Sequence, residues 1–171
     1  MTYTISQSGE KDIPTIFDLY AQASAHQRAL RKVVVWPKFE PAMVEEEIAQ
    51  GRQWKCLINQ QIVCVWSIAF QDPQIWEARE NHSSLYIHRI ATHSNFRGMQ
   101  MVQKIVTWAK AFAKKQHKTH IRLDTLGKNT KLISHYQSAG FTYLGLFAMN
   151  NTSNLPSHYH HNKVCLFEIE L

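Results

Sequence analysis

The sequence predicts a mixed α/β fold (α/β or α+β), in which a central mixed β-sheet is flanked by helices on both faces. Runs rich in β-branched and aromatic residues alternate with segments of helical periodicity along the 171 residues. The order of these segments is β-α-α-β-β-β-α-β-α-β-β, which combines neighbouring strands with strands joined through a helix. Hydrophobic residues make up 44% and charged residues 19% of the chain, as in an ordinary globular protein.

The N-terminal third predicts one edge strand and two helices. Asp12 is placed to cap the first helix, and Pro14 lies in its first turn. Val33–Pro37 is apolar but ends at a proline, which favours a loop or a short extended piece. The expected elements are a strand at residues 2–7, a helix from 12 to about 30, this loop, and a helix from 41 to 50.

The remainder predicts a hairpin followed by alternating strands and helices. A hairpin is expected around Asn59–Gln61, because β-branched and aromatic runs flank this turn. The expected elements are strands at 53–59, 61–70 and 85–91, a turn at 95–98, a helix at 99–117, a strand at 121–125, a short helix from 129, a strand at 141–149, a polar loop at 150–162 and a strand at 163–171.

The composition places further bounds on the protein. No linker or repeat marks a boundary, so a single domain over residues 1–171 is expected. Cys56, Cys64 and Cys165 lie in separate apolar runs, which indicates buried thiols in a reducing compartment. No apolar run has membrane-spanning length and the N-terminus has no signal-peptide core, so we expect a cytoplasmic protein without a membrane partner.

The net charge of +6 admits anionic partners, either a nucleic acid or a phosphorylated coenzyme. No reading helix or RNA motif is present, so a nucleic-acid partner is not expected. Most lysines of the helix predicted at 99–117 lie off its apolar stripe and form a solvated face. That stripe comprises Met101, Val102, Ile105, Val106, Ala109, Phe112 and Ala113.

A basic turn precedes the long helix. Gly98 can adopt a left-handed conformation that lets a phosphate approach the backbone, and Arg97 adds charge-assisted hydrogen bonds. The N-terminus of the following helix offers N–H groups and a positive dipole end, which suit a diphosphate. A simple turn with glycine as a connector explains this segment, taken alone, equally well.

Two segments of the chain carry a resemblance to a known family. Residues 95–102 resemble the acyl-CoA-binding signature of the GNAT acyltransferases, Arg/Gln-x-x-Gly-x-Gly/Ala, although Gln100 and Val102 stand where small residues are usual. Residues 129–141 resemble that family's second signature, Asn-x-x-Ala-x-x-x-Tyr-x-x-x-Gly-Phe. The second signature matches at Asn129, Tyr136, Gly140 and Phe141. The close resemblance covers roughly residues 84–147.

This resemblance implies a GNAT-like fold and an N-acyltransferase that moves an acetyl group from acetyl-CoA to an amine by direct transfer in a ternary complex. The pyrophosphate of coenzyme A would be held by Arg97, Gly98, Met99, Gln100, Met101 and Val102. The backbone of Ile90, Ala91 and Thr92 would bind the thioester oxygen and the pantetheine amides, and Asn129 would contact the pantetheine arm. The Cβ atoms of Gln100 and Val102 narrow the loop but leave its binding amides in place. No metal is implied.

By the same resemblance, Tyr136 is the general acid that protonates the leaving thiolate. The residues alone leave another interpretation open, because Leu132, Ile133 and Tyr136 share one apolar face of the short helix, as a core tyrosine would.

The general base has two candidates. His88 stands where several GNAT enzymes carry a glutamate, and imidazole titrates near neutral pH. Asp124 on the following strand is the rival, and a purely structural His88 is equally well supported. Strand alternation places His88 on the face opposite Ile87 and Arg89.

Other features have weaker signals. The run His158–His161 has no carboxylate or cysteine near it, so a solvated loop is favoured over a metal site. Glu45–Glu47 could attract a cationic acceptor, although such runs are usually solvated, and Trp36 could line the acceptor pocket or cover the core. The acceptor is a small-molecule or peptide amine that the sequence does not name. The terminal strand could support a homodimer by sheet or strand exchange.

The replaced glycines also support a second hypothesis, in which a protein of the same fold binds or senses coenzyme A without efficient catalysis.

Overall fold

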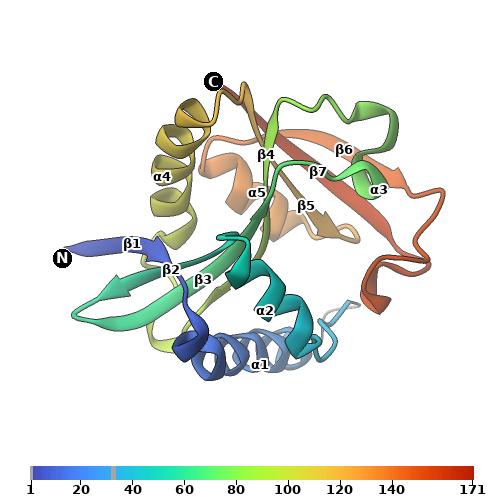
Figure 1. The fold of residues 1–171 in the computed structure, drawn as a ribbon. Coiled ribbons are helices and arrows are strands. Elements are labelled where there is room, and N and C mark those ends of the chain that lie inside the picture. Colours follow the sequence, from blue (N-terminus) through green and yellow to red (C-terminus); the bar gives the residue numbers. More distant parts are fainter. Residues whose placement is uncertain (1, 32–33) are drawn as a thin grey trace. The chain divides into compact units, whose positions relative to one another are not determined.

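The computed structural model describes residues 2–31 and 34–171 (Figure 1). Part of the piece predicted at Val33–Pro37 therefore lies outside the described residues, and the part from residue 34 onward forms neither helix nor strand, in agreement with the predicted loop. None of the described helices is long and apolar enough to cross a membrane.

The described chain forms a mixed sheet with helices, and the predicted fold class is confirmed. β4 pairs with β5 in parallel, whereas β1–β2, β2–β3, β5–β7 and β6–β7 are antiparallel pairs. The strands follow the order β1-β2-β3-β4-β5-β7-β6. The elements are β1 (Tyr3–Gln7), α1 (Ile13–Ala29), α2 (Pro41–Ala49), β2 (Gln53–Ile58), β3 (Gln61–Ala69), α3 (Pro73–Trp76), β4 (Ser84–Thr92), α4 (Met101–Lys115), β5 (His120–Leu126), α5 (Thr130–Ser138), β6 (Thr142–Ala148) and β7 (Lys163–Glu170).

Several boundaries differ from the predicted ones. The sequence did not predict α3, which spans a single turn and is followed by the 3-10 helix η2 (Glu77–Arg79). The long helix α4 begins at Met101, two residues later than predicted, because Gln100 takes a left-handed conformation that no α-helix accepts. The remaining 3-10 helices are η1 (Glu10–Asp12), η3 (Ser94–Phe96) and η4 (Ser157–Tyr159).

The chain divides into two compact units. The first comprises the chain up to Ile68 together with His88–Met101, and the second comprises Ala69–Ile87 and Val102–Leu171. β4 therefore contributes its first four residues to the second unit and its remainder to the first.

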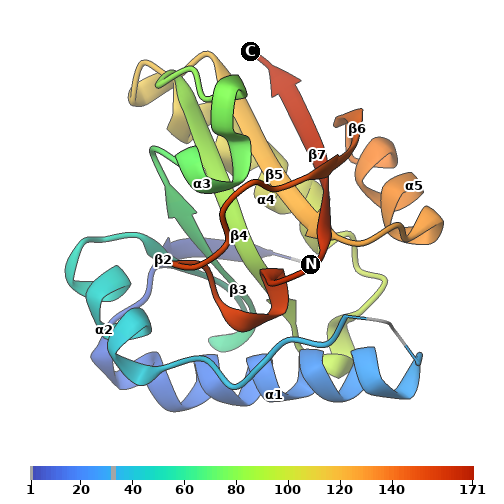
Figure 2. The ribbon, with the colours of Figure 1, turned by 90° about the vertical axis from the view of Figure 1, so that its right-hand side faces the viewer.

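In the first unit, α1 and α2 pack on one face of the strands. Their buried residues Ile16, Leu19, Tyr20 and Val44 form a cluster with Phe39, Val65 of β3 and Ala91 of β4. Figure 2 shows the segment from residue 34 to α2 running back along α1. The predicted hairpin is confirmed, and both Asn59 and Gln60 are left-handed, as a tight two-residue turn requires.

Asp12 serves a different purpose from the one predicted. It lies at the start of α1, but its carboxylate makes no hydrogen bond to the first turn of that helix. Instead, Oδ2 accepts the Gly9 N–H (2.8 Å) and the ammonium of Lys55 on β2 (2.5 Å). Burial by itself raises the pKa of Asp12, but these hydrogen bonds and the Lys55 charge outweigh burial and leave the pKa lowered.

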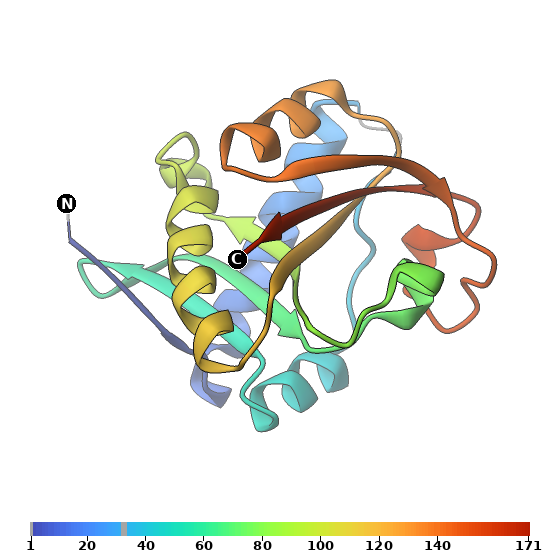
Figure 3. The ribbon, with the colours of Figure 1, turned by 90° about the horizontal axis from the view of Figure 1, so that it is seen from above.

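In the second unit, the alternation along β7 separates two packed faces. Val164 and Leu166 join Trp76 of α3 and Tyr86 of β4 in one buried cluster. Phe167 points to the other side, where its ring lies 5.3 Å from that of Tyr136 on α5. Figure 3 shows α5 beside β6, so helices cover both faces of this part of the sheet.

The terminal strand β7 lies inside the sheet of the second unit, not at its edge. It pairs with β5 on one side and with β6 on the other. The edge of this unit is β6, where the large apolar side chains Leu144 and Leu146 are exposed. A homodimer formed by sheet extension here would therefore use β6.

We predict that Asp12→Asn lowers the free energy of unfolding at pH 7 by about 2 kcal/mol, because Lys55 loses a buried anionic partner. Since the folded pKa of Asp12 is lowered, its contribution is present above the unfolded value of about 4 and is lost as pH falls through the folded value. Urea unfolding at pH 7 and near pH 3 should show a shallower acid dependence in the variant. Asp18→Asn, on the exposed face of α1, is the control and should resemble wild type at both pH values.

Candidate functional site: the turn before α4

The turn between β4 and α4 contains two left-handed residues. Gly98 has φ +82° and Gln100 has φ +55°. A Cβ at Gly98 would meet no atom within 4 Å, so the space beside it is open. Gln100 stands where the family signature has glycine, and its backbone adopts the conformation that glycine takes without steric cost. Its side chain is exposed, so it does not fill the loop.

The N–H groups of this turn are suited to an anion. Arg97 N–H donates to Ser94 O (3.4 Å) and Met99 N–H donates to Phe96 O (3.3 Å). Within residues 2–31 and 34–171, no backbone hydrogen bond occupies the N–H of Gly98 or Gln100. The first N–H groups of α4 have no intrahelical partner, as at every helix start. Unpaired donors and a positive dipole end therefore meet at the position that the sequence predicts for a diphosphate.

The side chain of Arg97 ties the turn to α1. Its guanidinium donates to the main-chain oxygen of Gln22 (3.2 Å), and Gln22 Oε1 in turn accepts the N–H of Ser94 (3.0 Å). The turn is thus held by side chains of the first unit and does not rest on its own backbone hydrogen bonds alone.

Another left-handed residue, Arg89, lies within β4. Arg89 has φ +51°, which interrupts the regular alternation that the sequence predicts for His88 and its neighbours. The guanidinium of Arg89 forms an ion pair with Glu47 of α2 and donates to Ser67 Oγ (2.8 Å) and Tyr20 Oη (3.4 Å). The side chains of Arg89 and Glu47 are only 14% and 7% exposed, so the pair lies almost entirely out of water.

The network around Arg89 shifts the pKa values of Arg89 and Tyr20 and buries Glu47. Burial by itself lowers the pKa of Arg89, but its attraction to Tyr20 and Glu47 outweighs burial and raises the pKa above its usual range. Burial also raises the pKa of Tyr20. Glu47 is buried and paired with Arg89, so the solvated position favoured for residues 45–47 is wrong at Glu47, whereas Glu45 and Glu46 are exposed as expected.

The strand segment Ile90–Thr92, expected to hold the thioester, continues directly from this network. Ala91 is buried in the first-unit cluster, and Ile90 and Thr92 are half-buried. Thr92 Oγ1 lies 3.3 Å from Cys64 Sγ. Burial raises the pKa of Cys64 to about 12, so this cysteine is an inert thiol. All three cysteines are free and buried, as the sequence predicts.

In the second unit, α5 brings together Asn129 and Tyr136. Asn129 caps the helix as predicted, because its side-chain oxygen accepts the N–H of Leu132 (3.2 Å). Tyr136 is 9% exposed, and its ring contacts those of Phe141 (5.9 Å, edge to face) and Phe167 (5.3 Å). This packing fixes the ring, which suits both a positioned acid and a core tyrosine.

The two base candidates, His88 and Asp124, are both half-buried. His88 lies on β4. Asp124 on β5 accepts a hydrogen bond from the hydroxyl of Tyr159 (2.8 Å), which comes from the predicted polar loop. That loop is less solvated than predicted, since His158 and His160 are half-buried and His160 Nε2 lies 3.1 Å from Leu155 O.

A mixed sheet in which β4 leads through a left-handed turn into a helix N-terminus defines an α/β protein with a turn suited to an anion. Within that class, the sequence profile described as the acetyltransferase (GNAT) family matches residues 18–141. The chain therefore belongs to the GNAT acetyltransferase family.

The chain is also similar to one relative in sequence and to two solved structures in fold. The uncharacterized N-acetyltransferase YesJ of Bacillus subtilis is 30% identical over 74 residues, which are 43% of this chain and 41% of that protein. The fold is similar to a GNAT-family acetyltransferase of Listeria monocytogenes (TM-score 0.75, 19% identity, 99% and 95% of the two chains). It is also similar to yncA of Salmonella typhimurium, solved with its cofactor acetyl-CoA (TM-score 0.68, 14% identity, 100% and 95%).

The sequence interpretation missed the roles of Arg89 and Glu47. A signal for Glu47 was present, because it shares a helix face with the apolar residues Val44 and Ile48, three residues before and one after it. A carboxylate on a buried helix face almost always has a partner. The left-handed backbone of Arg89 has no comparable signal, since it follows from contacts with residues distant in sequence.

We predict that Gln100→Gly raises the free energy of unfolding by roughly 0.5–1 kcal/mol, because glycine removes the steric cost of the left-handed backbone. Gln103→Gly, at an exposed position in the first turns of α4, is the matched control and should lower it by about 1 kcal/mol. Urea unfolding measures both variants. If the two substitutions have the same sign, the left-handed assignment at Gln100 is incorrect.

We predict that Glu47→Gln lowers the free energy of unfolding by about 3 kcal/mol, because the Arg89 charge stays buried without its anionic partner. Glu46→Gln, one residue earlier and exposed on α2, should change it by less than about 0.5 kcal/mol. Equal denaturation midpoints for the two variants would contradict the buried ion pair.

Proposed function

We propose that the protein is an N-acetyltransferase that moves the acetyl group of acetyl-CoA directly to an amine acceptor. The observation that carries the proposal is the left-handed turn at Gly98 and Gln100 before the N-terminus of α4, where main-chain donors are suited to a diphosphate. Membership of the GNAT family and a similar structure solved with acetyl-CoA support it.

In this proposal the main chain of the turn from Arg97 to Val102 binds the pyrophosphate, and the charge of Arg97 adds to it. The backbone of Ile90–Thr92 binds the pantetheine amides and polarises the thioester carbonyl, and Asn129 contacts the pantetheine arm. Binding depends mainly on amides, so it tolerates the side chains of Gln100 and Val102.

The transfer step uses a positioned acid and a base. The amine nitrogen attacks the carbonyl carbon, an amide C–N bond forms and the C–S bond breaks. Tyr136 donates its proton to the leaving sulfur, and the amine proton passes to His88, with Asp124 as the alternative base. No metal takes part.

The acceptor is a small-molecule or peptide amine, and we place the reaction in the cytoplasm with no membrane or nucleic-acid partner. A second candidate function is a coenzyme A-binding or sensing module. The left-handed Gln100 favours this second function, because the chain keeps a strained glutamine at a position where glycine would carry no strain.

We predict that Tyr136→Phe lowers kcat for acetyl transfer about 100-fold or more, because the thiolate leaves without a proton. The KM for acetyl-CoA should change little, since the hydroxyl acts at the chemical step. The measurement is release of free coenzyme A with a panel of amines.

Tyr143→Phe is the matched control, because Tyr143 packs on the same Phe167 ring (5.4 Å) from β6 and should keep wild-type turnover. Equal rates for wild type and Tyr136→Phe would remove the assigned acid. Calorimetric binding of coenzyme A without transfer to any amine would establish the sensing module instead.

A further inference from the structure

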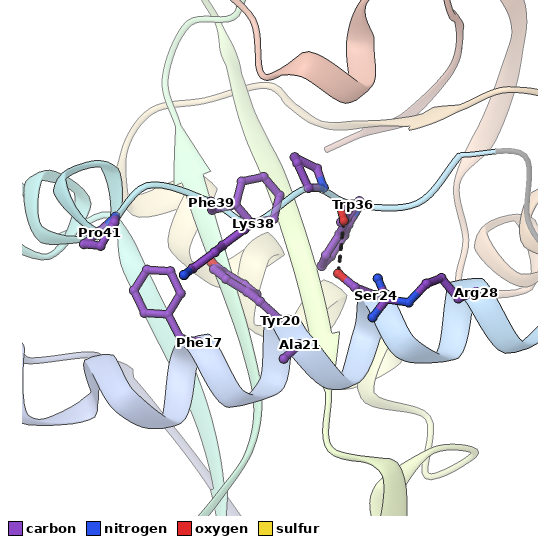
Figure 4. A pocket seen from close by; sticks show the side chains of 10 residues that line it. Phe17, Tyr20, Ala21, Ser24, Arg28, Trp36, Lys38, Phe39 and Pro41 are labelled. Carbon is purple, nitrogen blue, oxygen red and sulfur yellow. Dashed lines mark hydrogen bonds between the residues drawn. The ribbon is translucent and has the colours of Figure 1, made fainter.

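A cavity of about 370 Å³ lies in the first unit, between α1 and the segment that leads to α2 (Figure 4). Its walls are mainly apolar and include Phe17, Tyr20 and Ala21 from α1 and Trp36 and Phe39 from the connecting segment. Ligand pockets typically measure about 300–1,000 Å³, so this cavity admits a compact molecule and excludes a folded peptide chain.

The aromatic wall is fixed before any ligand binds. The Tyr20 ring lies 5.3 Å from Phe39, 6.0 Å from Trp36 and 6.1 Å from Phe17, with all three contacts edge to face. The main chain of Trp36 is bound to α1 at both polar groups. Its N–H donates to Gln27 Oε1 (2.7 Å) and its carbonyl accepts the hydroxyl of Ser24 (3.2 Å).

Two cations border the cavity. In Figure 4, Lys38 extends from the connecting segment toward Phe17, and Arg28 lies on α1 beside Ser24. Among the described residues that line the cavity there is no carboxylate. The charged groups at the cavity therefore favour an anion.

Aromatic walls can also bind cations, but the positive charges of Arg28 and Lys38 oppose cation binding in this cavity. The ammonium of Lys38 already extends along the aromatic wall and would repel a second cation. The buried carboxylate Glu47 is paired with Arg89. A polyamine is accordingly a poor ligand for this cavity.

The cavity adjoins the strand expected to hold the thioester. Tyr20 and Phe39 belong to the same buried cluster as Ala91 of β4, and the half-buried Trp36 packs against that cluster. Arg89, two residues earlier on that strand, donates to the Tyr20 hydroxyl (3.4 Å) and packs over the Phe39 ring (5.5 Å). A ligand in the cavity would therefore lie next to the residues that support β4.

We propose that this cavity is the acceptor site and that it selects a compact amine with an aromatic or branched apolar body and an acidic group bound by Arg28 and Lys38. The proposal rests on the proposed function, because it takes the ligand of the cavity to be the acetyl acceptor.

The test compares four probes on the full chain: L-phenylalanine, phenylacetate, phenethylamine and spermidine. Binding is measured by tryptophan fluorescence and calorimetry without acetyl-CoA. We expect phenylacetate and L-phenylalanine to bind about tenfold more tightly than phenethylamine, which lacks the acidic group, and spermidine not to displace them. With acetyl-CoA added, L-phenylalanine should be acetylated faster than spermidine.

Variants separate charge from shape. Arg28→Gln and Lys38→Gln should each weaken phenylacetate binding about threefold to tenfold. The same variants should strengthen phenethylamine binding, because a cation that repels its ammonium group is removed. Arg31→Gln and Lys11→Gln, at exposed positions that do not line the cavity, are the matched controls. Ala21→Trp should abolish binding of all three aromatic probes without unfolding the protein, because Ala21 is exposed on α1 and borders the cavity.

The outcomes distinguish this proposal from the function on which it rests. If spermidine is acetylated and Ala21→Trp does not change its rate, the acetyltransferase stands and the acceptor-site proposal is overturned. If no amine is acetylated, the function fails, while phenylacetate binding that depends on Arg28 and Lys38 still supports an anion-selective cavity. Equal affinities for phenylacetate and phenethylamine would overturn the charge selection itself.

Discussion

The buried pair of Arg89 and Glu47 is the interaction on which the first unit depends. An ion pair taken out of water costs less when its remaining polar atoms are hydrogen-bonded. The guanidinium of Arg89 is also hydrogen-bonded to Ser67 and Tyr20, whereas Glu47 Oε2 is buried without a hydrogen-bond partner among the described residues. A single side chain of β4 is thereby bonded to residues of α1, α2 and β3. To reach all three partners its backbone becomes left-handed, which interrupts the strand just before the segment expected to hold the thioester.

The turn before α4 keeps the backbone conformation of the family signature although the sequence departs from that signature. The backbone at Gln100 still takes the left-handed conformation that the glycine of the signature allows. The donors that would face a diphosphate are main-chain N–H groups, so a side chain directed to solvent changes the stability of the turn more than its chemistry. Tolerance of this kind is expected wherever the backbone provides the binding groups.

Local signals in the sequence predicted the strands, the main helices, the hairpin at Asn59–Gln60 and the Asn129 cap, because each follows from periodicity or capping within a few residues. Non-local features could not be read in this way. The late start of α4 depends on one left-handed residue, and the Asp12 carboxylate is drawn to Lys55 on a strand 43 residues later. The cavity depends on a loop that folds back on α1. Its two cations lie at one cavity only because Trp36 is hydrogen-bonded to that helix.

The charges at the cavity bear on the proposed chemistry as well as on selectivity. An acceptor amine is protonated at neutral pH and must lose a proton before it can attack. Arg28 and Lys38 would bind its acidic group and at the same time disfavour its ammonium form, which lowers the pKa of the bound amine. A weaker base is then sufficient. The half-buried His88, or Asp124 with its carboxylate already hydrogen-bonded to Tyr159, would serve. The weak sequence signal for the base is consistent with a site in which Arg28 and Lys38 help to deprotonate the acceptor.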